Sequence, residues 1–151
     1  MARRWRAKCS ARLFERVQTE KRLVIVGDAP HADDYIRQVK ATEDRRILFP
    51  GAIYGEGYRE LLSHAFCYVQ ATEVGGTHPA LIEAMGCGRC VLSLDTPENR
   101  EVAGEAGIAF EKSPEALAAK MTSVLDDAAL RDGAGTKALR RIEEHYRWEN
   151  V

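Results

Sequence analysis

Short apolar runs alternate with segments of helical periodicity along this chain, and that alternation limits the fold more than any other feature. The run Leu-Val-Ile-Val at residues 23–26 is followed by Gly27-Asp28-Ala29-Pro30, which is typical of a buried parallel strand and a turn. Further strands are expected at residues 47–49, 66–70, 90–94 and 108–110. Helices are expected between and after the strands, at residues 31–41, 57–64, 79–87, 98–102, 115–126 and 128–147.

Strands separated by single helices predict βαβ units with right-handed crossovers. We therefore predict a Rossmann-like α/β domain, in which a parallel sheet is flanked by helices. Ligands of such sheets bind beyond the carboxyl ends of the strands. The loops at residues 27–30, 50–57 and 72–79 would lie at that edge.

The length of 151 residues corresponds to about one domain and allows a substantial core. Hydrophobic residues make up 45% of the chain and charged residues 30%, so a disordered chain is not expected. No apolar run approaches the ~20 residues of a membrane-spanning helix, and the basic N-terminal stretch lacks the apolar segment of a secretory signal. We therefore expect a cytoplasmic protein with reduced cysteines.

The net charge of −1 conceals an uneven distribution of charge. Residues 1–22 have eight basic and two acidic side chains, a balance of +6, so the rest of the chain has a balance of −7. A basic segment of this kind can bind anionic lipid or nucleic acid. This segment lacks the interleaved aromatic residues of single-strand binders, so we interpret it as a solvated helix face or an irregular start of the chain and expect no nucleic-acid partner.

The loop before Pro79 has the composition of an anion site. Gly75 and Gly76 let the backbone approach a ligand closely. The helix that begins at Pro79 directs free N–H groups and the positive end of its dipole toward this loop, and Thr77 or His78 could cap it. Such a loop suits a phosphate, although an ordinary strand-to-helix turn would have the same pattern.

Glu83 lies one turn into that helix. A carboxylate only accepts hydrogen bonds, so it suits two adjacent sugar hydroxyls, and an acidic residue on a ribose is common in nucleotide-binding sheets. The alternative is a glutamate that faces solvent and is favoured near the N-terminus of the helix by the dipole.

Other common motifs for catalysis or cofactor binding are missing. Residues 27–30 do not form a G-x-G-x-x-G fingerprint, and there is no P-loop pattern. Cys87 and Cys90 match C-x-x-C, but this pair ends a helix and begins a strand, so we interpret both as small buried residues rather than a redox pair. The histidines at positions 31, 64, 78 and 145 are not at metal-ligand spacing, and we expect no metal site.

Several segments together resemble the donor-binding lobe of family 4 glycosyltransferases, which have the GT-B fold of two Rossmann-like lobes. The stretch from Glu73 to Gly88 resembles the donor-site signature of that family, and residues 96–107 resemble the segment that follows it. Residues 23–30 resemble its strand-plus-GDGP element, with Ala29 in place of glycine. Two C-terminal pieces also fit the family pattern: Ser113-Pro114-Glu115-Ala116-Leu117 and Tyr146-Arg147-Trp148-Glu149.

The resemblance implies roles for two glutamates. Glu83 matches the second glutamate of the family's E-x7-E motif, which holds the ribose of the nucleotide. Gly75 lies eight positions before Glu83, where the family has its first glutamate near the donor sugar, and the nearest acidic residue is Glu73, ten positions before. Glu73 is therefore the candidate catalytic group. The stretched motif resembles the VGGT-type subgroup, whose relatives include bacterial polysaccharide transferases.

The other donor-binding positions also follow from the resemblance. The glycine loop before the helix would offer backbone groups to the donor sugar or the distal phosphate, and the loop at residues 51–57 would meet the base. The candidates for donor binding are Gly27, Asp28, Pro30, Gly51, Tyr54, Gly75, Gly76, Thr77, His78 and Glu83. The family implies a nucleotide-sugar donor (UDP, GDP or ADP type), transfer with retention, no required metal and no other cofactor.

Parts of the family pattern are not matched in this sequence. Residues 10–17 resemble the helix that follows the family's first strand, and residues 1–9 match nothing, so the first strand and the Arg…Lys pair after it are expected to be missing. The lobe is expected to span residues 10–151, without the N-terminal acceptor lobe and without the helix that follows the Tyr-x-Trp-Glu segment. Such a chain would be inactive alone, and any membrane contact would need the full-length enzyme.

Two functions are compatible with these features. The first is a donor-binding lobe of a retaining glycosyltransferase that acts on a glycan or a lipid-linked glycan. The alternative is a non-catalytic Rossmann-like module that binds a partner through a cleft left apolar by truncation. Binding of a nucleotide would favour the first function, and a homodimer that binds no nucleotide would favour the second.

Overall fold

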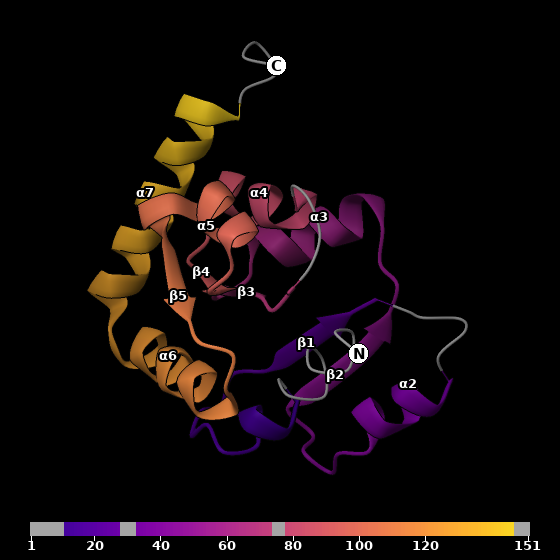
Figure 1. Cartoon of the computed structure of the whole chain (residues 1–151). Helices are drawn as coiled ribbons and strands as arrows, with labels where there is room; N and C mark the ends of the chain where they lie inside the picture. Colours follow the sequence, from indigo (N-terminus) through magenta and orange to yellow (C-terminus); the bar gives the residue numbers. More distant parts are fainter. Residues whose placement is uncertain (1–10, 28–32, 74–77, 147–151) are drawn as a thin grey trace.

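The computed structural model describes residues 11–27, 33–73 and 78–146 (Figure 1). The strands are β1 (Leu23–Val26), β2 (Ile47–Gly51), β3 (Tyr68–Gln70), β4 (Val91–Leu94) and β5 (Gly107–Phe110). The helices are α2 (Asp33–Lys40), α3 (Gly55–Ser63), α4 (Pro79–Gly86), α5 (Pro97–Ala103), the 3-10 turn η2 (Gly104–Ala106), α6 (Pro114–Asp126) and α7 (Ala128–His145). A helical turn at residues 11–14 precedes β1.

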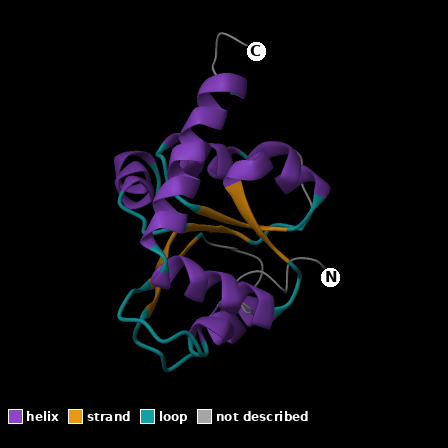
Figure 2. Cartoon of the chain, turned by 90° about the vertical axis from the view of Figure 1, so that its left-hand side faces the viewer, coloured by secondary structure: helices purple, strands orange, loops and turns teal. Residues whose placement is uncertain are grey.

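The predicted α/β class is confirmed. Every strand pair is parallel, and helices lie on both sides of the strands (Figure 2). Each expected strand and helix is present within the described residues, with boundaries that differ by a few residues. None of the helices in the described ranges combines the length and the apolar character that crossing a bilayer requires.

One strand extends further than we predicted. β2 continues through Pro50 and Gly51, whereas the sequence suggested an end at Phe49. Proline cannot donate to a sheet ladder, so it is tolerated mainly on edge strands. Among the described strands β2 pairs only with β1, and the N–H of Gly27 still donates to the carbonyl of Gly51 at 2.9 Å.

The strands form two parallel sheets rather than the continuous sheet that the alternation predicted. One sheet has the order β1-β2 and the other has the order β3-β4-β5. In the described part of the chain no strand lies between β1 and β3, so each of these two strands has one unpaired edge. In Figure 1, β1 and β2 accordingly lie apart from β3, β4 and β5.

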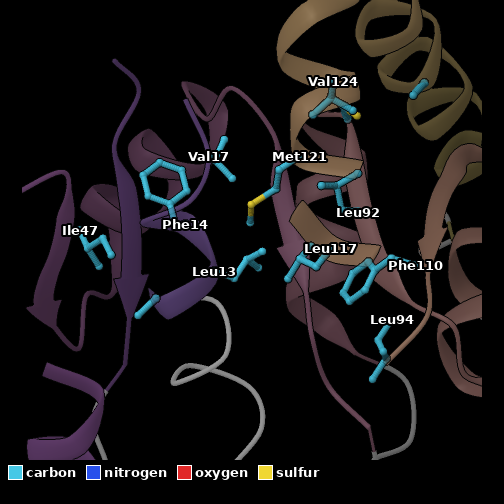
Figure 3. Close-up of a cluster of buried hydrophobic side chains, with 13 residues drawn as sticks. Leu13, Phe14, Val17, Ile47, Leu92, Leu94, Phe110, Leu117, Met121 and Val124 are labelled. Atoms are coloured by element: carbon cyan, nitrogen blue, oxygen red, sulfur yellow. The ribbon is translucent and has the colours of Figure 1, made fainter. Parts of the chain in front are cut away.

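The helical turn at residues 11–14 joins the two sheets. Leu13 and Phe14 are buried in one hydrophobic cluster that includes Ile47 of β2 and Leu92 of β4. Figure 3 shows Leu13 and Phe14 between Ile47 on one side and Leu117 of α6 on the other. Burial of apolar surface at this turn therefore helps to hold the two sheets together.

A second cluster lies on the other face of β4, beneath α4, α5 and α7. The packing of α4 on α7 depends on two glycines. Gly88 ends α4 in a left-handed conformation, with φ +66°, and a Cβ at Gly135 of α7 would lie 2.4 Å from the carbonyl oxygen of Gly88. The close approach of these helices therefore requires glycine at position 135.

Candidate functional site

The candidate site lies where the parallel strands end. Gly27 follows β1, Glu73 follows β3, Asp95 follows β4 and Lys112 follows β5. Because the carboxyl ends of parallel strands meet at one edge of a sheet, the loops after β3, β4 and β5 lie together. The helix α4, with Glu83, also begins at this edge.

Among the described residues, two acidic side chains at this edge form ion pairs, Glu73 and Asp95, and Glu73 is the less exposed of the two. Its Oε2 lies 2.9 Å from Nζ of Lys112, and the Glu73 side chain is 13% exposed. Its Oε1 is buried and has no hydrogen-bond partner among the described residues. One oxygen of the carboxylate is thus fixed by a cation, and the other can still accept a hydrogen bond.

Asn99 positions the backbone next to Glu73. This side chain of α5 is fully buried, and its Nδ2 donates to the carbonyl of Leu94 at 2.9 Å and to the carbonyl of Thr72 at 3.1 Å. It therefore ties the loop after β3 to the end of β4. The turn that holds Asn99 is capped by Thr96, whose Oγ1 accepts from the N–H of Asn99.

Glu83 faces two tyrosines rather than only solvent. Burial and a hydrogen bond to the Glu83 carboxylate raise the pKa of Tyr58, a residue of α3. Burial and the negative charge of Glu83 raise the pKa of Tyr68 of β3 to about 12. Glu83 is itself exposed, and its carboxylate lies near the Tyr58 hydroxyl at the start of α4.

The N-terminus of α4 agrees in part with the prediction. Pro79 occupies the first turn, and the N–H groups of Leu81 and Ile82 donate to the carbonyl of His78 at 3.0 and 3.2 Å. His78 is the N-cap residue by its backbone, but its side chain forms no capping hydrogen bond. The structure therefore places His78 at the N-cap, one of the two positions predicted, and imidazole is not among the side chains that favour a capping hydrogen bond there.

The loops after β1 and β2 approach each other. The N–H of Gly27 donates to the carbonyl of Gly51, and both glycines have positive φ angles of +131° and +82°. Tyr54 precedes α3 and is 84% exposed, without a side-chain capping bond. An aromatic ring that is this exposed at the strand-end edge is available to stack on a planar ligand.

Several predicted donor-binding residues lie outside the described residues: Asp28, Pro30, Gly75, Gly76 and Thr77. The basic N-terminal segment 1–9 is also outside them. The proposed roles of these residues therefore remain predictions from the sequence.

The redox interpretation of the C-x-x-C pair has no support in the structure. Cys87 and Cys90 are both free, and burial raises the pKa of Cys90 to about 11. A redox-active cysteine needs a lowered pKa. Within the described ranges, no three His, Cys, Asp or Glu side chains gather as a metal site would require.

Sequence reasoning did not identify Lys112, Asn99 or Tyr58 as parts of the site. Lys112 could have been found, because it follows a predicted strand and so must lie at the same edge as Glu73. Asn99 and Tyr58 gave no such signal, since a polar residue within a short helix is more often exposed.

The fold is that of a Rossmann-like α/β domain, with the candidate site at the carboxyl ends of its parallel strands. A solved structure with the same fold is the C-terminal domain of the glycosyl transferase group 1 family protein LpcC from Francisella tularensis. The match covers 97% of this chain and 80% of the LpcC domain chain, with a TM-score of 0.79 and 18% sequence identity. Another is the structure of Alr3699/HepE from Anabaena in complex with UDP and glucose, with a TM-score of 0.73 and 17% sequence identity. That match covers 91% of this chain and 39% of the HepE chain.

The sequence comparisons identify the family. The model of the family described as glycosyl transferases group 1 matches residues 4–127. The chain belongs to this family. It is also similar to O-antigen chain mannosyltransferase B of Escherichia coli, with 26% identity over 131 residues. That match covers 85% of this chain and 34% of the relative, so the chain spans about a third of that protein's length.

Proposed function

We propose that this chain is the donor-binding lobe of a retaining glycosyltransferase that uses a nucleotide-sugar. The membership of glycosyl transferases group 1 over residues 4–127 is the observation that supports this proposal most directly. The same proposal includes the VGGT-type subgroup and an acceptor that is a glycan or a lipid-linked glycan. The name of the similar mannosyltransferase, which refers to the O-antigen chain, favours such an acceptor.

Glu83 would accept hydrogen bonds from the two ribose hydroxyls of the nucleotide. Its carboxylate lies one turn into α4, near the Tyr58 hydroxyl, and the residue is exposed, so a ligand at the strand ends can reach it. The exposed ring of Tyr54, beside Gly51, would meet the base.

Glu73 would act next to the donor sugar. As the nucleoside diphosphate departs, the anomeric carbon becomes electron-poor, and a nearby carboxylate stabilises that positive character. Lys112 neutralises part of the Glu73 charge through Oε2, while the unpartnered Oε1 would accept a hydrogen bond from a sugar hydroxyl. Asn99 keeps the adjacent backbone of Thr72 in place.

The glycine loop at Gly75, Gly76 and Thr77, together with the N-terminus of α4 at His78, would bind the distal phosphate through backbone N–H groups. Cationic groups must also neutralise the departing diphosphate. The chain spans about a third of the length of the similar mannosyltransferase. We therefore propose that these residues bind the donor weakly and that turnover needs the rest of a full-length enzyme.

Calorimetric titration of the folded chain with UDP, GDP and ADP tests the proposal. We expect saturable heat with at least one of them, and the structure of HepE with UDP makes UDP the first choice. The variant Glu83→Gln should weaken that binding by about 1–3 kcal/mol, because a charge-assisted acceptor is lost.

The matched control is Glu143→Gln on the exposed face of α7, which makes the same chemical change away from the strand ends. It should leave the affinity unchanged. Absence of heat with all three nucleotides, in protein shown to be folded by circular dichroism, would refute the proposal. Equal losses in both variants would refute the role of Glu83.

A further inference from the structure

The ion pair between Glu73 and Lys112 crosses the end of the three-stranded sheet. Glu73 comes three residues after β3 and Lys112 comes two residues after β5, and β4 lies between these two strands. Nζ of Lys112 nevertheless lies 2.9 Å from Oε2 of Glu73. The pair therefore spans the carboxyl end of the central strand of this sheet, where sheets of this class bind their ligands.

The two partners of this pair are buried to different extents. The Glu73 side chain is 13% exposed, whereas the Lys112 side chain is 54% exposed. The cation offsets only part of the cost of burying the carboxylate, because Oε1 has no hydrogen-bond partner among the described residues. An apolar pair of similar volume is often as stable as a buried ion pair. The pair is therefore better explained by what it does to a ligand at the strand ends.

The loops at this edge have no surplus of positive charge. Lys112 faces Glu73. Arg100 of α5 donates from Nη2 to Oδ2 of Asp95 at 2.6 Å. Another carboxylate, that of Glu111, follows β5. In the described loops after β3, β4 and β5, and in α5, each lysine or arginine is thus held by a carboxylate, and carboxylates are in excess.

This balance of charge favours a neutral sugar beside Glu73. A carboxylate only accepts hydrogen bonds, so the hydroxyl groups of a neutral sugar complement it. An acidic sugar would bring a second carboxylate close to Glu73, and the cations described at this edge are already paired. Two like charges at about 6 Å, with an effective dielectric constant of about 20, repel each other enough to weaken binding by tenfold or more.

We propose that the pair of Glu73 and Lys112 makes this site selective for a nucleotide-sugar whose sugar is neutral. Lys112 would act as a positioning residue, which holds Oε2 of Glu73 and offsets part of the charge that the sugar meets. Loss of the Glu73 charge would leave a free cation that attracts an acidic sugar, whereas loss of Lys112 would leave a carboxylate that repels it more strongly. This inference rests on the proposed function, since it concerns the sugar of the same donor.

Calorimetric titration with two donors that differ in one group tests the selectivity. The probes are UDP-glucose and UDP-glucuronate, in which a carboxylate replaces a hydroxymethyl group, and UDP is titrated in parallel. Where GDP or ADP is the nucleotide that binds, the same two sugars are carried on that nucleotide. We expect the 151-residue chain to bind the glucose compound about tenfold more tightly than the glucuronate at low salt, where screening is weak.

Two variants should shift this preference in opposite directions. Glu73→Gln should lower the ratio of the two affinities by about threefold or more, because Lys112 becomes free to attract the glucuronate. Lys112→Met should raise the ratio by a similar factor, because the charge of Glu73 is no longer offset. The affinity for UDP should change less than the ratio does, since UDP lacks the transferred sugar. A merely structural role would instead weaken all three ligands together.

Three further variants complete the test. Lys137→Met, at an exposed position of α7, is the matched control and should leave the ratio unchanged, because distant surface charges are screened. Lys112→Arg retains a cation and should keep a ratio close to that of the unaltered chain. If Lys112→Met does not fold, the double variant Glu73→Gln/Lys112→Met takes its place. Its ratio should be higher than that of Glu73→Gln alone, since the free cation is removed.

The outcomes separate this inference from the proposed function. If UDP, GDP or ADP binds but its glucose and glucuronate compounds bind equally well, the selectivity is overturned and donor binding still stands. The inference is also overturned if Glu73→Gln and Lys112→Met shift the ratio in the same direction. An equal loss of affinity for UDP and UDP-glucose in Lys112→Met would overturn it too, and would assign Lys112 to the diphosphate. Absence of binding by every nucleotide would refute the proposed function and this inference with it.

Discussion

Replacement of Arg46 by methionine should destabilise the chain, although the Arg46 side chain is partly exposed. Arg46 precedes β2, and its guanidinium donates to carbonyls of a distant segment: to Val17 and Thr19 at 2.8 Å each, and to Phe14 at 3.3 Å. The same guanidinium lies 5.0 Å from the Phe14 ring centre. It therefore closes the end of the helical turn that joins the two sheets.

The size of the effect follows from those bonds. Arg46 also pairs with Asp44, and its side chain is 29% exposed. Methionine would keep much of the contact with the Phe14 ring but would leave the carbonyl of Val17, a buried residue, without this donor, whereas the carbonyl of Phe14 would still accept from the N–H of Val17. A lost charge-assisted bond to a partly buried carbonyl costs about 1 kcal/mol or more, so the sum is about 2–3 kcal/mol.

Urea denaturation followed by circular dichroism measures this loss. With a slope of about 2 kcal/mol/M for a chain of this size, the midpoint for Arg46→Met should fall by about 1–1.5 M. The slope itself should stay constant, because the same surface is exposed on unfolding.

Arg140→Met is the matched control. Arg140 bonds to Glu144 at 2.7 Å, but its side chain is 79% exposed on α7. A surface ion pair of this kind contributes little, so the midpoint should not change measurably. If the two variants have the same midpoint, the bonds from Arg46 to the carbonyls do not stabilise the fold and our reasoning about this residue is wrong.

Further outcomes can be checked with the same denaturation assay. Gly135→Ala should lower stability because its Cβ would meet the carbonyl oxygen of Gly88. Gly133→Ala in the same helix has open space around it and should raise stability by about 0.5–1 kcal/mol. Equal effects of the two variants would contradict the close approach of α4 and α7. Burial raises the pKa of Cys67 to about 12. Above about pH 9 the thiol therefore ionises in the unfolded chain but not in the folded one, and the free energy of unfolding should fall by at most about 1.4 kcal/mol per pH unit. The variant Cys67→Val should reduce this slope. An unchanged slope in that variant would show that the thiol is not buried. Asn99→Ala should cost about 2–3 kcal/mol and also weaken any nucleotide-sugar binding, and a variant of full stability would disprove its role as a tie between loops.

The order of elements could be predicted because strands and helices differ in apolar period. The runs at residues 23–26 and 90–94 are short and continuous, and Pro79 marks a helix start that the structure confirms. The continuity of the sheet could not be predicted from the same signal. The apolar period of a strand indicates which of its faces are buried, whereas its pairing in a sheet depends on which other strands lie beside it.

The candidate site was predictable to a similar extent. Topology alone places Glu73 and Glu83 at one edge, as the loops and α4 confirm. The ion pair from Glu73 to Lys112 joins residues that are far apart in the sequence, and no local pattern encodes it. The same is true of Tyr58, whose contact with Glu83 depends on how α3 packs beside α4.

The split into two sheets has a consequence for how the chain folds. Leu23 pairs with Ile47, Tyr68 with Val91 and Val91 with Gly107, so each ladder closes a loop of no more than 24 residues. Closing such loops costs little chain entropy, and each half can form its own ladder without waiting for the other. Leu13 and Phe14 share one buried cluster with residues of β2, β4 and α6, which are distant from them in the sequence. The rate of folding should therefore be set by the docking of the halves on this one helical turn, and by neither ladder.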